Sequence, residues 1–217
     1  TQAESSAASD VYKRQFQYVL MDFLFVGCSI TWGDELKDRL NERYSKLVCD
    51  ALGANEHNFA ECGQSNDWIA RRTVEETRKR RYDRIYVQLT VPSRLEYFTE
   101  KDTHKFRIQM MTRKKEKYWH EGRWYYKMVY NRQLGIENMY KNKFLIENAV
   151  DFRTQLVFLF TDCCLEGQKK HRNLHEQSYW NQLCKINNTW IWKDILGPYS
   201  TTIDMMGERG HPLEPAH

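Results

Sequence analysis

Short runs of continuous apolar residues recur along this chain, and each is about as long as one β-strand. Residues 18–26, 84–91 and 155–160 are rich in β-branched, aromatic and aliphatic side chains, which is typical of strands buried on both faces. Residues 57–60 form a shorter run that also favours a strand. We therefore predict that these runs form a sheet covered on both sides.

Segments with helical periodicity separate these runs. Residues 35–52, 68–81 and 137–152 carry apolar side chains at spacings of three and four, and Ser65 or Asn66 can cap the middle segment. Strands that alternate with helices indicate a parallel sheet between two helical layers, a three-layer α/β/α sandwich. The side chains expected on the buried helix faces are Leu36, Leu40, Tyr44, Leu47, Val48, Leu52, Ile69, Val74, Met139, Tyr140, Phe144, Leu145 and Val150.

The composition suits one folded domain. The 217 residues are 41% hydrophobic and 14% aromatic, which is enough for one sizeable core. A net charge of +4, from 33 basic and 29 acidic residues, is too small to indicate nucleic-acid or membrane binding. No apolar run approaches the roughly 20 residues of a membrane span. Six cysteines without regular spacing indicate reduced thiols, so we expect a cytoplasmic protein.

The two ends of the chain are set apart from this domain. Residues 1–15 are small and polar, then basic, and they lack the apolar centre of a signal peptide. We expect them to be non-native or disordered, and we expect a single domain at residues 16–217. Residues 211–217 resemble a loop that enters a helix, so we also expect a truncated C-terminus.

The first apolar run ends abruptly at Gly27-Cys28-Ser29, and polar residues that favour a helix start follow. Open α/β sheets bind their ligands at the carboxyl ends of the strands. A serine hydroxyl there would face the crevice, and the backbone N–H groups of the next turn could stabilise an oxyanion beside it. By itself this stretch is better explained as a strand followed by a turn of small residues.

A second stretch, near the end of the chain, favours the catalytic interpretation. Glu208 precedes His211 by three residues in a loop rich in glycine, so one loop could deliver both groups to Ser29. His211 would take the serine proton, and Glu208 would orient the imidazole and balance its charge. The Gly63 loop completes the order of nucleophile, glycine loop and carboxylate–histidine pair. His217 is a second candidate base, and His211 is preferred.

These motifs, in this order, resemble the blocks of the SGNH (GDSL-like) hydrolases, and the resemblance covers residues 16–217. Residues 27–31 are similar to the first block, with cysteine in place of the usual aspartate. Gly63 matches the second-block glycine. Residues 208–212 are similar to the final Asp-x-x-His-Pro block, with glutamate in place of aspartate.

The resemblance implies a flavodoxin-like fold and a serine ester hydrolase that needs no metal or organic cofactor. Ser29 would be the nucleophile, His211 the general base and Glu208 the residue that orients it. The backbone N–H groups of Ser29 and Gly63, helped by Asn66, would bind the oxyanion. The implied substrate is a small acyl ester on a carbohydrate or a similar polar molecule.

One block departs from the family. The third block normally supplies an asparagine as an oxyanion donor, but residues 88–94 contain none, and Thr90 stands where the family has glycine. Asn66 could supply a side-chain N–H instead, or could serve only as a helix cap. Loss of one oxyanion donor typically lowers the rate by about two to three powers of ten. The alternative is therefore a catalytically weak or inactive module on the same fold, which binds a glycan or a protein.

Two further clusters are explained without a ligand. Residues 96–130 form an insertion dense in aromatic and basic residues, which could line a sugar or nucleic-acid surface. We favour an insertion that packs its rings back on the body, and we expect no nucleic-acid partner. Zinc could be bound by Cys163, Cys164, His171 and His175, but adjacent cysteines chelate poorly and the spacing matches no standard module, so no metal site is predicted.

Overall fold

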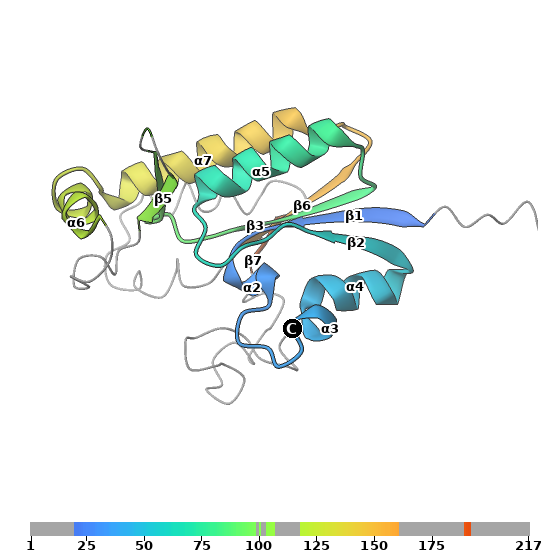
Figure 1. Ribbon diagram of the computed structural model, residues 1–217. Coiled ribbons are helices and arrows are strands. Elements are labelled where there is room, and N and C mark those ends of the chain that lie inside the picture. Colours follow the sequence, from blue (N-terminus) through green and yellow to red (C-terminus); the bar gives the residue numbers. More distant parts are fainter. Residues whose placement is uncertain (1–19, 99, 101–102, 107–117, 161–188, 192–217) are drawn as a thin grey trace, which may run out of the picture.

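A five-stranded parallel sheet forms the centre of the protein in a computed structural model, which describes residues 20–98, 100, 103–106, 118–160 and 189–191 (Figure 1). The order of its strands is β2-β1-β3-β6-β7. With the strands numbered along the chain this is the 2-1-3-4-5 order of flavodoxin-like folds, which confirms the predicted fold class. The strands are β1 (Met21–Val26), β2 (Ala54–Asn58), β3 (Arg84–Leu89), β6 (Gln155–Phe160) and β7 (Thr189–Ile191).

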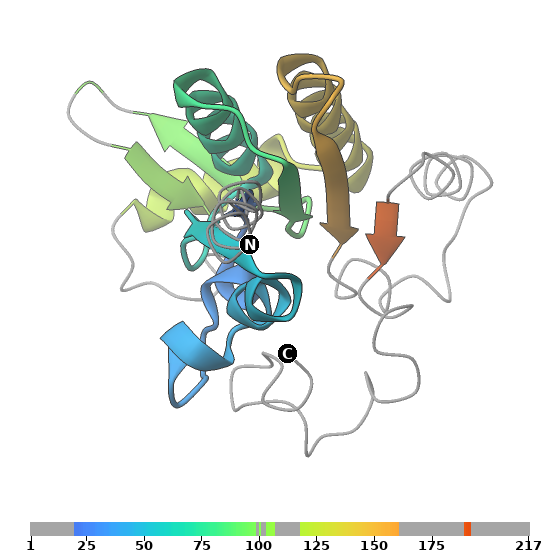
Figure 2. The same ribbon diagram turned by 90° about the vertical axis from the view of Figure 1, so that its right-hand side faces the viewer.

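Helices cover both faces of this sheet, as Figures 1 and 2 show. On one face lie α5 (Asn66–Lys79) and α7 (Arg132–Ala149), side by side. On the other face lie α2 (Ser29–Trp32), α3 (Arg39–Glu42) and α4 (Tyr44–Leu52). The three-layer arrangement is therefore confirmed. In the part of the chain that the structure describes, no helix is long and apolar enough to cross a membrane.

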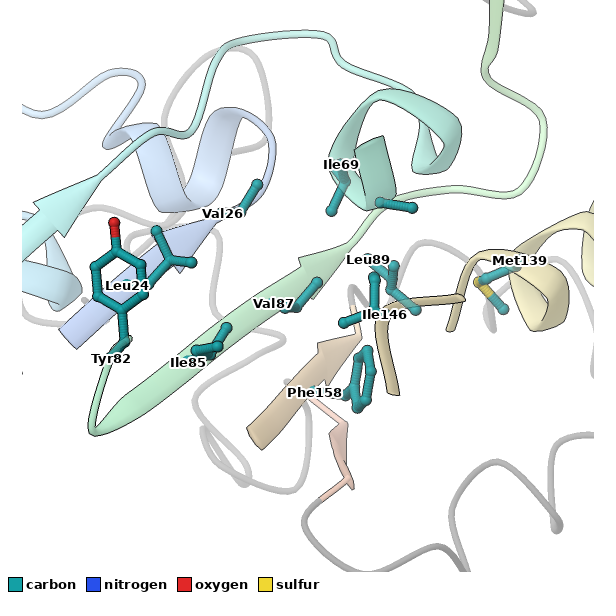
Figure 3. Close-up of a cluster of buried hydrophobic side chains, with 11 residues drawn as sticks. Leu24, Val26, Ile69, Tyr82, Ile85, Val87, Leu89, Met139, Ile146 and Phe158 are labelled. Atoms are coloured by element: carbon teal, nitrogen blue, oxygen red, sulfur yellow. The ribbon is translucent and has the colours of Figure 1, made fainter. Parts of the chain in front are cut away.

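Alternate side chains of each strand enter two separate cores. Leu24 and Val26 of β1 pack with Ile85 and Val87 of β3 against α5 and α7, as Figure 3 shows. Phe23 and Phe25, which alternate with them along β1, point to the opposite face, where they pack against α4. Each such buried side chain contributes about 1.5–3 kcal/mol relative to an exposed one. Continuous apolar runs are needed because both faces of the sheet are covered.

The predicted helix at residues 35–52 is wrong in its extent. The structure has two shorter helices, α3 and α4, separated by Arg43 in an extended conformation (φ −66°, ψ 142°). This break lets the Arg43 guanidinium bond both carboxylate oxygens of Glu56 on β2, at 2.9 and 2.8 Å. Contrary to the prediction, the side chains of Leu40, Leu47 and Leu52 are exposed.

The last predicted helix, at residues 137–152, begins earlier than expected, because Asn131 caps α7 by accepting the backbone N–H of Leu134. Its buried face also differs from the prediction, since Phe144 and Leu145 are exposed. Lys143 is buried instead, with its ammonium paired to Glu147 and lying over the ring of Phe158. A paired lysine can therefore occupy a core position that hydrophobicity alone would not assign to it. The buried side chains of α7 include Ile136, Met139, Lys143 and Ile146.

Other elements differ from the prediction at their boundaries. The second strand covers Ala54–Asn58 rather than 57–60, and β7 was not predicted as a strand. The insertion at residues 96–130 contains a hairpin of β4 (Leu95–Phe98) and β5 (Thr103–Phe106), followed by α6 (Trp119–Met128). These three elements lie together beyond the carboxyl ends of the parallel strands, at the left of Figure 1.

Candidate functional site

Ser29 lies where the order of the strands reverses. β1 is flanked by β2 on one side and β3 on the other. In open α/β sheets the ligand crevice lies at such a reversal, outside the carboxyl ends of the strands. Ser29 begins α2 directly after β1, and Thr90 follows β3 at the same edge. The serine is buried, with 6% of its surface exposed, and its Oγ lies 3.8 Å from Cys28 Sγ. The structure thus places Ser29 at the carboxyl edge of the sheet, where the sequence predicted it.

Gln88 of β3 holds the turn of Gly27–Thr31, which we call the Ser29 turn. Its side-chain oxygen accepts the backbone N–H groups of Cys28 and Thr31, both at 3.2 Å, and the Thr31 hydroxyl at 2.7 Å. Its Nε2 lies 3.4 Å from Cys28 Sγ. Gln88 is 1% exposed, so these bonds do not compete with water. One buried carboxamide therefore sets the orientation of the backbone on both sides of Ser29.

Glycine is required at residue 27 because the Gln88 side chain packs directly against the backbone there. A Cβ built at residue 27 would lie 2.8 Å from Gln88 Cβ and 2.9 Å from its Oε1, and it would also collide with Thr31 Oγ1. Any side chain here would push Gln88 away from the turn. The first-block glycine therefore allows a strand-to-helix turn to pack directly on the neighbouring strand.

Hydrogen bonds from α4 and from the end of β2 complete the support of the turn. The Thr31 hydroxyl lies 3.1 Å from the hydroxyl of Tyr44, and Asn58 Nδ2 donates to the carbonyl oxygen of Thr31 at 2.8 Å. Burial raises the pKa of Tyr44 well above its usual value, so this phenol stays neutral. Burial also raises the pKa of the nearby Cys49 thiol to about 11, which makes it a poor nucleophile.

The Gly63 loop follows β2 at the same edge. Gly63 has φ +77°, a left-handed conformation that favours glycine, and Glu61 donates its backbone N–H to the carbonyl oxygen of Gly27 at 3.3 Å. This bond joins the loop to the Ser29 turn. The two glycine-containing loops predicted to form the oxyanion hole are therefore brought to adjacent positions.

Asn66 ties the Gly63 loop to the end of β3. Its Oδ1 accepts the Thr90 backbone N–H at 2.8 Å, and its Nδ2 donates to the Thr90 carbonyl oxygen at 3.1 Å. The cap of α5 is Ser65, whose hydroxyl accepts the Trp68 backbone N–H. Asn66 is thus the first residue of the helix rather than its cap. One of its two amide hydrogens is used on Thr90.

His211 and Glu208 lie outside the described residues, so their approach to Ser29 stays a prediction, as does the alternative base His217. The described residues do contain one histidine–carboxylate pair, His57 Nε2 with Asp22 Oδ1 at 2.7 Å, and this hydrogen bond lowers the pKa of Asp22. Asp22 lies near the amino end of β1. About 13 Å of strand separate it from Val26, so this pair cannot serve Ser29.

No cluster of three or more metal-binding side chains occurs among the residues that the structure describes. The zinc candidates Cys163, Cys164, His171 and His175 fall outside those residues. Within the described ranges, Cys28 and Cys49 are free, buried thiols.

Sequence reasoning missed Gln88, because it was counted within an apolar strand. A signal was present, since a glutamine in the middle of a buried run must find hydrogen-bond partners. The sequence could not say which partners, because they come from the turn about 60 residues earlier.

No protein-family model matches the chain, and no curated protein matches it by sequence. Its structure is similar to several solved structures. A member of the lipolytic protein G-D-S-L family from Veillonella parvula DSM 2008 is 11% identical, with a TM-score of 0.50, over 88% of this chain and 89% of that chain. A catalytic mutant of Axe2, an acetylxylan esterase from Geobacillus stearothermophilus, is 14% identical, with a TM-score of 0.51, over 91% of this chain and 89% of that chain. TesA is 10% identical, with a TM-score of 0.51, over 88% of each chain.

At such low identity the likeness concerns the fold alone, and it agrees with the strand order of the sheet. The chain therefore has the fold of the SGNH (GDSL-like) hydrolases, as its motifs predicted.

Proposed function

We propose that the chain is a serine ester hydrolase of the SGNH type. The observation that carries this proposal is the position of Ser29, which is buried where the order of the strands reverses. Its turn is fixed because the N–H groups of Cys28 and Thr31 and the Thr31 hydroxyl all donate to the side-chain oxygen of Gln88. A nucleophile needs a fixed position relative to the acyl carbon, because misplacement by about 1 Å can cost a hundredfold in rate.

In the proposed reaction Ser29 Oγ attacks the acyl carbon while His211 takes its proton. The tetrahedral intermediate collapses as His211 returns the proton to the leaving alcohol, and an acyl-enzyme remains. Water then attacks this ester by the same route and releases the carboxylic acid. Glu208 orients the imidazole and balances its positive charge.

The oxyanion would be bound by the backbone N–H groups of Ser29 and Gly63 and by the second amide hydrogen of Asn66. Support comes from the hydrogen bonds that join the Ser29 turn, the Gly63 loop and Thr90 at one edge of the sheet. We propose a small acyl ester on a carbohydrate as the substrate, since one structure of the same fold is of an acetylxylan esterase.

A binding module without turnover is the second candidate. It is favoured by the use of the Asn66 amide on Thr90 and by the lack of an asparagine in residues 88–94. The two candidates differ in whether Ser29 is nucleophilic, which can be measured directly.

The test is hydrolysis of p-nitrophenyl acetate together with labelling by a fluorophosphonate. We expect Ser29→Ala to lower kcat/KM by at least about a thousandfold, because the covalent step is lost. We expect mass spectrometry to find the phosphonate on the Ser29 peptide, and His211→Ala to slow the labelling. Thr73→Val is the matched control, since it removes a buried hydroxyl from α5, outside the crevice. Equal rates for the wild type and Ser29→Ala, with no label at Ser29, would discard the hydrolase and leave the binding module.

A further inference from the structure

A cavity lies between β4 and α6, outside the Ser29 turn. Its volume is about 360 Å³, which is within the range of small-molecule sites. Figure 1 places β4 and α6 beyond the carboxyl ends of the strands, the end of the sheet at which Ser29 also lies. We call this cavity the aromatic pocket, and its lining residues are Leu95, Tyr97, His120, Glu121, Trp124 and Tyr125.

The rings of this region divide into two groups. Tyr126 is 8% exposed and packs with Leu95, Tyr125 and Tyr130, as expected for an insertion that folds back on the body. In contrast, Trp124 is 61% exposed and Tyr97 is 36% exposed, although both line the pocket. Both rings keep part of their apolar surface exposed beside one cavity, and Trp124 keeps most of it exposed. Such apolar surface is typical of a binding site.

The pocket is attached to the loop that leaves the Ser29 crevice. The Tyr126 hydroxyl donates to the carbonyl oxygen of Ser93 at 2.6 Å. Arg94 donates to the carbonyl oxygen of Gln64 at 3.3 Å, in the loop that carries Gly63. Glu96, with 3% of its side chain exposed, is held by Arg71 at 2.7 Å. The segment from β3 to β4 therefore connects the wall of the pocket to the candidate oxyanion loop.

The chemistry of the lining defines the occupant. Most of the wall is aromatic or aliphatic, with one carboxylate, Glu121, and one imidazole, His120. A pyranose ring offers a face of C–H groups, which carry partial positive charge and stack on the negative face of an aromatic ring. Its hydroxyl groups, at the edge of the ring, can bond a carboxylate and an imidazole.

Other occupants fit less well. The carboxylate of Glu121 would repel the phosphates of a nucleic acid or the head group of a fatty acid. Arg123 does not line the pocket, and its guanidinium lies over the Trp119 ring, 5.0 Å from the ring centre. A plain alkyl chain would leave the polar groups of Glu121 and His120 without partners from the ligand.

We propose that the aromatic pocket binds a pyranose ring of the carbohydrate ester whose acyl group is cleaved at Ser29. The statement that the bound sugar belongs to the ester cleaved at Ser29 rests on the proposed function. The statement that the pocket binds a sugar does not. Binding energy from this remote ring would position the ester, so long oligosaccharide esters would be better substrates than acetylated monosaccharides.

The test is isothermal titration calorimetry of the full chain carrying Ser29→Ala, which cannot turn over an ester. The probes are unsubstituted xylopentaose, mannopentaose and cellopentaose. We expect at least one of them to bind, and Trp124→Ala to weaken its binding about tenfold or more, because the stacking platform is lost. Phe144→Ala is the matched control, since this ring on α7 is 67% exposed and does not line the pocket. It should leave the dissociation constant unchanged.

The proposal is overturned if none of the three sugars binds at millimolar concentration, or if Trp124→Ala leaves the dissociation constant unchanged. It is also overturned if octanoate binds in a Trp124-dependent manner and the sugars do not, which would identify an alkyl-chain site. The two proposals fail separately. Phosphonate labelling of Ser29 without sugar binding would discard only the pocket. Trp124-dependent sugar binding without labelling would discard only the hydrolase.

Discussion

The Ser29 turn and the aromatic pocket are both attached to β3 and the loop after it, but they differ in the polarity and the burial of the side chains that form them. The turn is held by buried polar groups, with Gln88 at its centre, and the side chain of Gln88 has almost no contact with solvent. The pocket is formed by large rings that remain exposed, such as Trp124. In our two proposals, the first region fixes a position for chemistry and the second offers a surface for recognition.

The difference has an energetic consequence. Removal of one partner from a buried hydrogen bond leaves the other unsatisfied, which costs about 1–3 kcal/mol. Substitutions at exposed positions usually change stability by less than about 0.5 kcal/mol. Changes in the turn should therefore lower both stability and activity, whereas changes in the pocket should alter binding alone.

Gly27→Ala should have the largest effect. The new methyl group would overlap Gln88 and Thr31, both of which are held by other bonds, so we expect a loss of about 3 kcal/mol in the free energy of unfolding. Urea denaturation measures this loss. Gly53→Ala is the comparison, because residue 53 has open space but φ +61°, and it should cost only about 1 kcal/mol. Equal losses at the two positions would mean that the turn is not tightly packed.

Gln88→Met should have the second largest effect. Methionine has a similar shape but no strong acceptor, so the N–H groups of Cys28 and Thr31 would lose their partner, at a cost of about 2 kcal/mol. If the hydrolase proposal holds, Gln88→Met should lower kcat for p-nitrophenyl acetate by a larger factor than the factor by which it changes KM. Gln88→Glu retains the acceptor oxygen and should restore part of both losses. A stable Gln88→Met variant with wild-type kcat would show that Gln88 does not position Ser29.

Tyr126→Phe should have the smallest effect of the three. It removes the bond from Tyr126 to the Ser93 carbonyl oxygen and should lower the free energy of unfolding by about 1 kcal/mol. Trp124→Ala on the same helix should change it by less than about 0.5 kcal/mol. Thermal unfolding of the two variants measures both values. A larger loss for Trp124→Ala would mean that this ring is part of the core and not a binding surface.

Much of the fold follows from local pattern. Continuous apolar runs predicted β1, β3 and β6, and the switch from Val26 to Gly27-Cys28-Ser29 predicted the turn after β1. The cap of α5 at Ser65 was one of two candidates. These features depend on residues near in sequence, whose periodicity and turn chemistry are visible without the rest of the chain.

The sequence by itself therefore determined the layered α/β fold and the edge of the sheet at which Ser29 stands. Only the tertiary structure decided that Gln88 supports the turn, that Arg43 interrupts a helix to bond Glu56, and that Trp124 remains exposed while Tyr126 is buried. The reason is physical. Periodicity shows that a side chain lies near the core. Its packing and hydrogen-bond partners depend on the order of the strands, because that order brings together residues far apart in the chain.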